Sequence, residues 1–184
     1  MKSLESQRLR LRQWRESDLA PFAKMNADPE VMRYFPNCLS KEQSNALVER
    51  FTRDIDKTGW GFWAAERLDN ADFIGFIGIN YTAQGLPFAP CVDIGWRLST
   101  SSWRQGLATE GAKLALRYAF EEADLTEIVS MTPLGNIASQ RVMQKLGMEA
   151  QASTFFHPKL DVDSPLAEHV LYRICRDQWL DQSV

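Results

Sequence analysis

The sequence predicts a mixed α/β fold of the α+β class, with a central, mostly antiparallel sheet of about seven strands and helices on both faces. Strand-like runs at 60–66, 73–79 and 91–98 follow one another closely, which is typical of antiparallel pairing. A helical pattern at 106–123 and a strand-like run at 127–132 then form a strand–helix–strand unit. No internal repeat, linker or low-complexity tract divides the 184 residues, so we expect one domain over 1–184.

The remaining elements follow in order along the chain. Residues 8–14 alternate in polarity and predict an opening strand, and Ser17 or Asp18 is expected to cap a helix that ends near Met25. Proline is tolerated at a first helical position, so residues 28–30 predict a short helical turn. A capping box at 40–43 begins a longer helix. The pattern also predicts a loop at 80–90, a helix at 136–146 and strands near 150–156 and 167–174.

The bulk composition is typical of a globular chain. Hydrophobic residues make up 45% and charged residues 24%, with a net charge of −3. No apolar run approaches the roughly 20 residues that cross a bilayer, and no segment is basic enough to favour nucleic-acid binding. The first residues lack an apolar signal core. The three cysteines are scattered without metal-ligand spacing, so we expect no metal site and reduced thiols in the cytoplasm.

The stretch from Trp103 to Gly111 is the most informative part of the chain. It follows the strand-like run 91–98 and opens an amphipathic helix. Gly106 permits a backbone conformation closed to other residues, and Ala108 keeps bulk away from the turn. The first amides of a helix lack an intrahelical partner and carry partial positive charge, so this loop suits a phosphate or diphosphate. Taken alone, the glycine is equally consistent with a plain turn, because no P-loop or Gly-x-Gly-x-x-Gly pattern is present.

A second motif strengthens the phosphate interpretation. Residues 136–148 predict a short helix with Asn136 near its start. Together the two motifs resemble the GNAT superfamily of acetyl-CoA-dependent N-acetyltransferases. The superfamily's phosphate loop, Gln/Arg-x-x-Gly-x-Gly/Ala, matches at Gly106 and Ala108, and its Asn-x-x-Ser helix matches at Asn136 and Ser139. The resemblance implies a GNAT-like acyl-CoA N-acyltransferase fold.

The resemblance extends over almost the whole chain. Residues 8–12, 28–32 and 169–173 resemble the branch that includes the ribosomal-protein N-terminal acetyltransferases. Trp103 departs from the superfamily, which often has Gln or Arg at this position. The departure casts little doubt on cofactor binding, because backbone amides hold the phosphate in such loops and Arg104 can supply positive charge. The cofactor-binding residues that the resemblance implies are Trp96, Arg97, Leu98, Trp103, Arg104, Gln105, Gly106, Leu107, Ala108, Thr109, Asn136 and Ser139.

Two side chains are the candidates for catalysis. Asp93 lies on the strand beside the expected cleft, where a carboxylate can accept the proton of the substrate ammonium; alternatively it pairs with Arg97 on the same face. Ser139 is the candidate proton donor to the departing thiolate, although a serine in a first helical turn can also bond only locally. His157 and His169 are residues of a type that suits proton transfer. The simpler interpretation is that His157 is a solvated surface residue and that His169, within a predicted strand, is a structural one.

The functional hypothesis is an acetyl-CoA-dependent N-acetyltransferase that acts by direct transfer. The acceptor would be a primary amine of a protein N-terminus or a small molecule, and the negative net charge weakly favours a cationic one. A non-catalytic acetyl-CoA-binding sensor would carry the same loop, and an enzyme for longer acyl groups would keep the same fold. The sequence leaves open whether the chain forms a homodimer.

Overall fold

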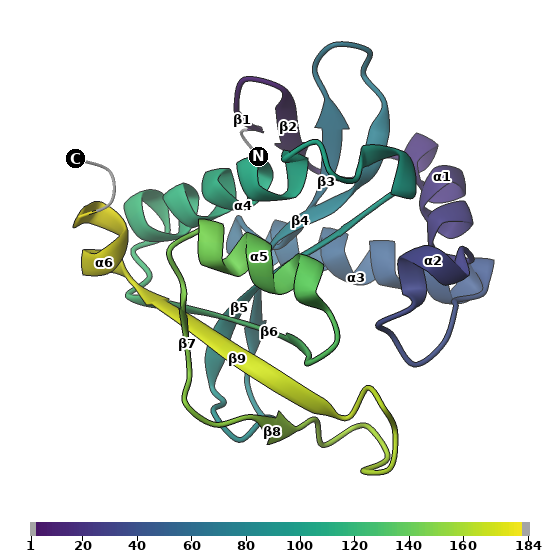
Figure 1. Ribbon diagram of the computed structural model, residues 1–184. Coiled ribbons are helices and arrows are strands. Elements are labelled where there is room, and N and C mark those ends of the chain that lie inside the picture. Colours follow the sequence, from purple (N-terminus) through teal and green to yellow (C-terminus); the bar gives the residue numbers. More distant parts are fainter. Residues whose placement is uncertain (1–2, 182–184) are drawn as a thin grey trace.

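The chain folds around one twisted sheet (Figure 1). The computed structural model describes residues 3–181, and within them the sheet has nine strands in the order β1-β2-β3-β4-β5-β6-β9-β7, with β8 paired to β9. All neighbours are antiparallel except β5 and β6. The strands span Leu4–Glu5 (β1), Leu9–Arg12 (β2), Phe62–Arg67 (β3), Phe73–Thr82 (β4), Cys91–Leu98 (β5), Glu127–Pro133 (β6), Glu149–Ala150 (β7), Phe155–Phe156 (β8) and Glu168–Cys175 (β9).

Helices cover both faces of this sheet. In the view of Figure 1, α3 lies behind the sheet and α4 and α5 lie in front of it. Phe51 of α3 packs against Phe62 and Phe76, whereas Gly111 of α4 faces Ile77 on the opposite side. The helices span Glu16–Asn26 (α1), Pro29–Met32 (α2), Lys41–Thr58 (α3), Leu107–Arg117 (α4), Ile137–Lys145 (α5) and Arg176–Asp181 (α6), with a 3-10 turn at Thr100–Ser102 (η1) and a π-helical turn at Tyr118–Glu122 (η2).

The predicted fold class is confirmed, and most predicted elements are present. β5 coincides with the predicted strand 91–98, and α3 begins with the predicted capping box: Gln43 N donates to Ser40 Oγ (3.2 Å) and Ser40 N donates to Gln43 Oε1 (2.8 Å). The sheet has more strands than predicted for two reasons. The two-residue strand β1 is too short to leave an alternating pattern, and the strand predicted near 150–156 is two separate two-residue strands, β7 and β8. β4 continues to Thr82, so the predicted loop 80–90 is shorter.

The N-cap of α1 is Arg15 rather than Ser17 or Asp18, but Asp18 takes part in the cap. It is the third residue of the helix, and its Oδ2 accepts from the Arg15 amide (2.8 Å). Asp18 also belongs to a buried ion-pair cluster. Arg12 Nη1 and Nη2 donate to the two carboxylate oxygens of Asp18 (2.7 and 2.9 Å), and Arg12 Nε donates to Glu66 Oε2 (2.7 Å). Arg12, Asp18 and Glu66 are 6%, 1% and 2% exposed, and we call these three residues the Arg12 corner.

Aromatic side chains fill the core on the α3 face. Rings of Phe22, Phe51, Phe62 and Phe76 contact one another with centroid separations of 4.9–6.1 Å. Trp63 is fully buried, as expected of an aromatic residue on a central strand. None of the helices within residues 3–181 combines the length and apolar composition that crossing a bilayer requires.

Candidate active site

A gap in the sheet forms the centre of the site. β5 and β6 run parallel, yet Asp93 with Val129 is their one ladder pair within residues 3–181. Ser130 Oγ donates to the Ile94 carbonyl (3.0 Å) and holds the two strands together at this point. Beyond it, the β5 edge from residue 95 to residue 98 has no strand partner on this side.

The unpaired edge of β5 presents backbone groups to the gap. The Ser99 amide donates to the Ile74 carbonyl of β4, and alternate residues of a strand direct their backbone groups to the same edge. Residues 95 and 97 therefore face β4, whereas the N–H and C=O of Trp96 face the gap. The Leu98 carbonyl is already used, because Trp103 Nε1 donates to it (2.8 Å). An extended ligand can bind such an edge as an added strand.

The loop between β5 and α4 adopts the conformation that its glycine predicts. Gly106 has a φ of +78° and Arg104 a φ of +60°, both in the left-handed region. The Glu110 amide donates to the Gly106 carbonyl (3.0 Å), which is the first helical bond of α4. Among residues 3–181, nothing accepts from the amides of residues 107–109. Three free amides at the start of an 11-residue helix favour an anion.

Residues far away in the sequence hold this loop in place, and no local signal predicted them. Arg8 Nη1 donates to the Gln105 carbonyl (2.9 Å), and Arg8 Nε donates to Glu110 Oε2 (2.7 Å). Ser6 Oγ donates to the same carboxylate (2.8 Å). The Gln105 side chain accepts from Arg67 Nη1 (3.0 Å), and Gln105 does not line the cleft described below, so the structure does not bring it together with the other predicted cofactor-binding residues.

Asn136 caps α5 and orients Ser139. Asn136 Oδ1 accepts from the Ser139 amide (3.3 Å), and Asn136 Nδ2 donates to Ser139 Oγ (3.0 Å) and to Thr132 Oγ1 (2.9 Å). An amide nitrogen only donates, so Ser139 Oγ is the acceptor here and keeps its own hydrogen for another partner. The capping role is therefore present, and both Asn136 and Ser139 also line the cleft.

Asp93 is held by neutral donors of β4. Asn80 Nδ2 (3.1 Å) and Thr82 Oγ1 (3.0 Å) both donate to Asp93 Oδ1. The alternative pairing with Arg97 is wrong, because Arg97 Nη1 instead donates to an amide oxygen of α1. Burial raises the pKa of Asp93, against the effect of its hydrogen bonds and of the nearby Arg50 charge. A carboxylate of raised pKa accepts a proton more readily than an ordinary one.

Both histidines lie in the wall of the cleft. Their ring centroids are 5.1 Å apart, and His169 Nδ1 lies 3.0 Å from the Ala167 carbonyl. Burial lowers the pKa of both imidazoles, so each is neutral near pH 7. The buried His169 agrees with the structural interpretation, whereas the half-buried His157 is not the solvated surface residue that the sequence suggested.

A cleft of about 980 Å³ joins these groups, a size typical of small-molecule sites. Tyr34 Oη donates to the Gly135 carbonyl (2.9 Å), which links the segment after α2 to the loop before α5.

Cys91, Trp60 and Trp63 do not line the cleft. The sequence-predicted residues that line it are Asp93, Trp96, Arg97, Leu98, Trp103, Arg104, Gly106, Leu107, Ala108, Thr109, Asn136 and Ser139.

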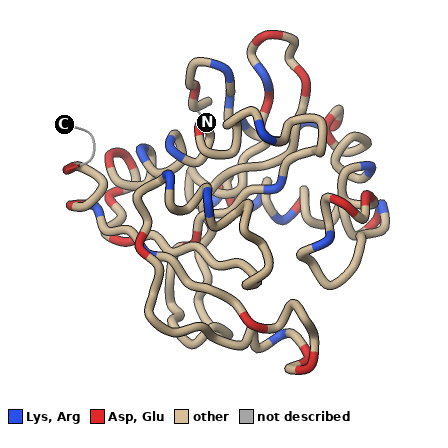
Figure 2. The backbone as a smooth tube through the Cα atoms, in the orientation of Figure 1, with Lys and Arg blue, Asp and Glu red and all other residues tan. Residues whose placement is uncertain are grey.

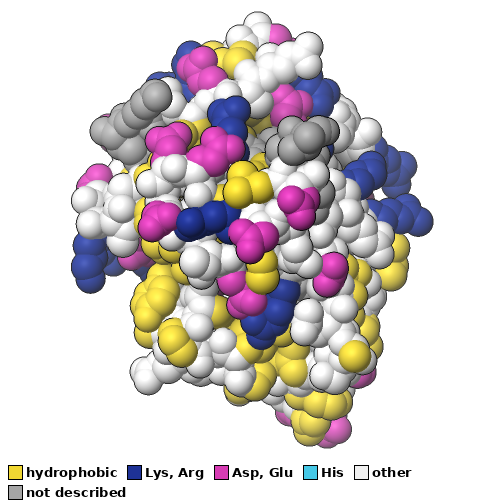
Figure 3. Space-filling model, turned by 90° about the vertical axis from the view of Figure 1, so that its left-hand side faces the viewer, with side chains coloured by type: hydrophobic (Ala, Val, Ile, Leu, Met, Phe, Trp, Pro, Cys, Tyr) yellow, Lys and Arg dark blue, Asp and Glu magenta, His cyan; other side chains and the backbone are white. Residues whose placement is uncertain are grey.

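The cleft is basic although the chain as a whole is acidic. Seven Lys and Arg residues line it against two acidic residues, Glu30 and Asp93, whereas the net charge of the chain is −3. Figure 2 marks basic residues on β5, on the loop before α4 and on α5. On the flank that faces the viewer in Figure 3, acidic and basic side chains are interspersed instead. The net charge therefore did not predict the charge of the site.

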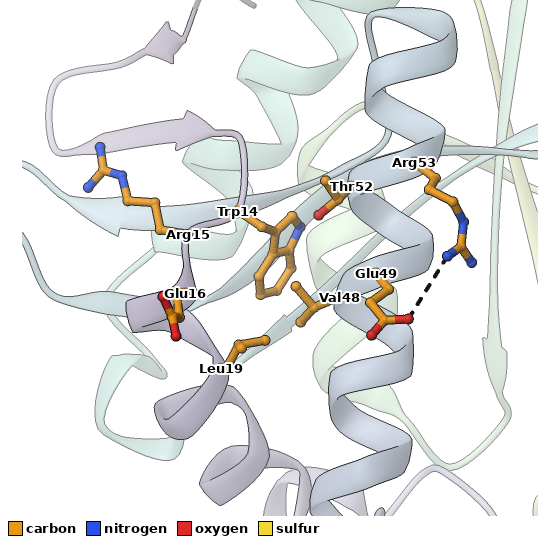
Figure 4. Close-up of a pocket in the computed structure, with 8 residues that line it drawn as sticks. All are labelled: Trp14, Arg15, Glu16, Leu19, Val48, Glu49, Thr52 and Arg53. Carbon is orange, nitrogen blue, oxygen red and sulfur yellow. Dashed lines mark ion pairs between the residues drawn. The ribbon is translucent and has the colours of Figure 1, made fainter.

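A second pocket, of about 410 Å³, lies between α1 and α3 (Figure 4). Trp14, Leu19 and Val48 form its apolar lining, and the exposed pair Glu49 and Arg53 lies beside it with an N–O distance of 4.0 Å. None of the sequence-predicted site residues lines this pocket. We therefore assign the site to the larger cleft.

Comparisons with known proteins show the family to which the chain belongs. A family model described as the acetyltransferase (GNAT) domain matches residues 8–149. The chain is 42% identical over 166 residues to the FsC-acetyl coenzyme A-N(2)-transacetylase of Aspergillus fumigatus, covering 85% of this chain and 69% of that protein. Its fold is similar to a GNAT-family acetyltransferase of Bacillus anthracis (TM-score 0.79, 21% identity, 96% and 99% of the two chains covered). It is also similar to RimL, a ribosomal alpha-N-protein acetyltransferase in complex with coenzyme A (TM-score 0.75, 15% identity, 96% and 99% covered).

Proposed function

The chain belongs to the acetyltransferase (GNAT) domain family and is an N-acetyltransferase, and on that premise we propose that it moves an acetyl group from acetyl-CoA directly to a primary amine. The observation that carries the proposal is the gap between β5 and β6, which opens beside three free amides of α4. The Trp96 backbone would hold the pantetheine arm, and the amides of residues 107–109 would hold the diphosphate.

The residues at this corner fit acetyl-CoA. A Cβ atom at Gly106 would meet only the side-chain atom Arg8 Nη2, at 3.6 Å, so the space beside this residue is otherwise open to a ligand. Arg104, Arg141 and Lys145 line the same end of the cleft and add positive charge for phosphates. Acetyl-CoA supplies a reactive thioester when bound, and the other chemical tasks fall to residues of this chain.

Three groups would share those tasks. The Trp96 N–H faces the gap and can donate to a thioester carbonyl. Asp93, with its raised pKa, can accept the ammonium proton directly or through water, and the Ser139 hydroxyl keeps its hydrogen for the departing sulfur. Burial and the nearby Asp93 charge raise the pKa of Cys91 to about 11, so its thiol is protonated at neutral pH. This supports direct transfer over a cysteine-bound acyl intermediate.

The acceptor is proposed to be a small-molecule amine or a protein N-terminus. The sequence resemblance to the ribosomal-protein acetyltransferases, together with the fold shared with RimL, supports the second class. The single domain over 1–184, the cytoplasmic location and a homodimer stay predictions.

Release of free thiol from acetyl-CoA over a panel of primary amines tests the proposal. We expect at least one amine to raise turnover well above hydrolysis, and acetyl-CoA to exceed propionyl- and succinyl-CoA as donor. Tight binding of acetyl-CoA without amine-dependent turnover would contradict the proposed acetyl transfer and would support the hypothesis of a non-catalytic acetyl-CoA-binding sensor. Faster transfer from propionyl- or succinyl-CoA would show that the donor is a longer acyl-CoA, while the reaction would still be acyl transfer to an amine.

A further inference from the structure

Arg97 is a cation at the cleft without an acidic partner. Its Nη1 donates to Asn26 Oδ1 (2.7 Å), and its guanidinium carbon lies 4.0 Å from the centroid of the Phe35 ring and 5.4 Å from that of Phe76. Asn26 is fully buried and is itself fixed, because its Nδ2 donates to Ser44 Oγ (2.8 Å). The guanidinium is therefore held in one place by a neutral amide and two rings.

The charge of Arg97 is not neutralised by the protein. Within residues 3–181 no carboxylate forms an ion pair with it, and its Nε is shielded from solvent without any hydrogen-bond partner. Burial lowers the pKa of Arg97 to about 10, a value at which the group is still charged at neutral pH. An uncompensated charge away from water is costly, so such a group commonly has a partner that the protein chain does not supply.

One nitrogen of the Arg97 guanidinium remains for a ligand. Asn26 occupies Nη1 and protein atoms shield Nε from solvent, whereas Nη2 is not shielded in this way and has no hydrogen-bond partner within residues 3–181. A guanidinium N–H that donates to a carboxylate oxygen forms a charge-assisted hydrogen bond.

The position of Arg97 separates it from the diphosphate site. Arg97 pairs with Phe76 across β4 and β5, so both side chains lie on the face that α3 covers. The helix α4, whose amides would hold the diphosphate, packs against Ile77 on the opposite face. An anion at Arg97 therefore belongs to the acceptor rather than to the cofactor. Arg33, Arg50 and Lys159 also line the cleft and give it a positive field.

We propose that Arg97, positioned by Asn26 and Phe35, binds a carboxylate of the acceptor, so that the substrate is a small amino carboxylate rather than a plain amine. This inference rests on the proposed function for the reaction itself. Of the two acceptor classes proposed above, it selects the small-molecule amine over the protein N-terminus, and it opposes the cationic acceptor that the net charge of the chain favours. Arg97 acts here in substrate recognition, and the chemistry stays with Asp93 and Ser139.

Matched pairs of acceptors test the proposal. The pairs are glycine, β-alanine, 4-aminobutyrate and 6-aminohexanoate, each with its carboxamide, assayed by thiol release with the full chain. For at least one length, we expect kcat/KM to be about 10- to 100-fold higher for the carboxylate, the range of a charge-assisted pair. The Arg97→Gln variant should lose this preference by losing activity on the carboxylate alone. Arg97→Lys should retain part of it, because the positive charge remains while the planar guanidinium that Asn26 and Phe35 position is lost.

A control and a binding assay keep the outcomes distinct. Arg53→Gln removes an exposed arginine outside the cleft and should leave the preference unchanged. Equal activity on both members of every pair, or an equal loss on both members in Arg97→Gln, would overturn the proposal. If no amine is acetylated, calorimetry with coenzyme A and the N-acetyl forms of the same pairs gives the answer without turnover. The proposal would be supported, although the proposed reaction had failed, if the N-acetyl carboxylates bind more tightly than their carboxamides and Arg97→Gln abolishes this difference. Equal binding of the carboxylates and the carboxamides would refute the proposal.

Discussion

Arg12 is buried and Arg97 is partly buried in the wall of the cleft, and the surroundings of these two arginines are opposite. Arg12 donates to two carboxylates, those of Asp18 and Glu66, so the charges of the Arg12 corner are satisfied within the fold. Arg97 donates to one neutral amide and keeps an unpartnered nitrogen. A charge that the protein neutralises itself serves stability, whereas a charge that it leaves open at a cleft is available to a ligand.

The difference separates two kinds of region. Changes in the Arg12 corner should lower stability and leave ligand recognition intact in the molecules that remain folded. Changes in the cleft should impair binding or turnover and leave stability nearly unchanged. The following variants test this separation, from the largest expected effect to the smallest.

Arg12→Gln should have the largest effect on folding. It leaves the buried carboxylates of Asp18 and Glu66 without their main partner, which typically costs about 3–5 kcal/mol. For a chain of this size, we expect Tm to fall by about 10 °C. Thermal unfolding followed by circular dichroism measures it. Arg53→Gln is the control, because an exposed pair contributes at most about 1 kcal/mol. Equal Tm values for the two variants would refute the structural role of the corner.

Gly106→Glu should abolish acetyl-CoA binding. The residue has a φ of +78°, and a carboxylate at the free amides of α4 would repel a diphosphate, so we expect affinity to fall by about 100-fold or more. Isothermal titration with acetyl-CoA measures this loss. Gly85→Glu is a matched control with the same charge at a similar φ of +90°, in a loop outside the cleft. Unchanged affinity in Gly106→Glu would move the diphosphate site elsewhere.

Ser139→Ala should lower kcat by about 100-fold, the lower end of the range of general acid catalysis, while the Kd for acetyl-CoA changes little. The split arises because the hydroxyl hydrogen would act only on the departing sulfur. Steady-state kinetics and titration provide the two values. Gln144→Ala, on the same helix but outside the cleft lining, should leave both unchanged. A fully active Ser139→Ala variant would return Ser139 to a purely local role in the cap of α5.

Two carboxylates should give opposite pH dependences of stability. Against the effect of burial, Arg12 together with Arg15 and Arg10 lowers the pKa of Glu66, so the contribution of Glu66 to stability is present above its ordinary pKa of 4.5 and lost as pH falls below it. Burial raises the pKa of Asp93, so folding is disfavoured above that raised value and recovers as pH falls toward 3.8. The free energy of unfolding, compared between wild type and Glu66→Gln or Asp93→Asn from pH 3 to 7, measures both slopes. If Glu66 and Asp93 contribute slopes of the same sign to the free energy of unfolding against pH, the predicted difference between the two carboxylates is wrong.

Arg97→Gln should have the smallest effect on stability. Removing an uncompensated cation offsets the lost bond to Asn26, so we expect the free energy of unfolding to stay within about 1 kcal/mol of wild type. Urea unfolding measures it, next to Arg12→Gln under the same conditions. A loss as large as that of Arg12→Gln would show that Arg97 is a structural residue.

Local patterns in the sequence predicted the elements and the phosphate-type loop well. Gly106 predicted a left-handed turn because few other residues adopt one, and the capping box at 40–43 and the strand 91–98 depend on neighbours within a few positions. The resemblance to the N-acetyltransferases rests on two such local motifs, and the family model agrees with it.

Contacts between distant residues could not be predicted in this way. Arg8 binds Glu110, 102 positions away, and Arg97 binds Asn26, 71 positions away. Asp93 receives its hydrogen bonds from Asn80 and Thr82 because β4 extends to Thr82, beyond the apolar residues that predicted a strand over 73–79. No single-residue pattern encodes these partners, since they depend on strand register and on the packing of helices.

The amino-acid order alone therefore determined the class of fold, the loop before α4 and the kind of cofactor such a loop suits. Only the tertiary structure decided that Asp18 neutralises Arg12, that no carboxylate of residues 3–181 pairs with Arg97, and that an acidic chain carries a basic cleft. The physical reason is range: backbone conformation follows from neighbours along the chain, whereas the pairing of charges follows from which segments the fold brings together.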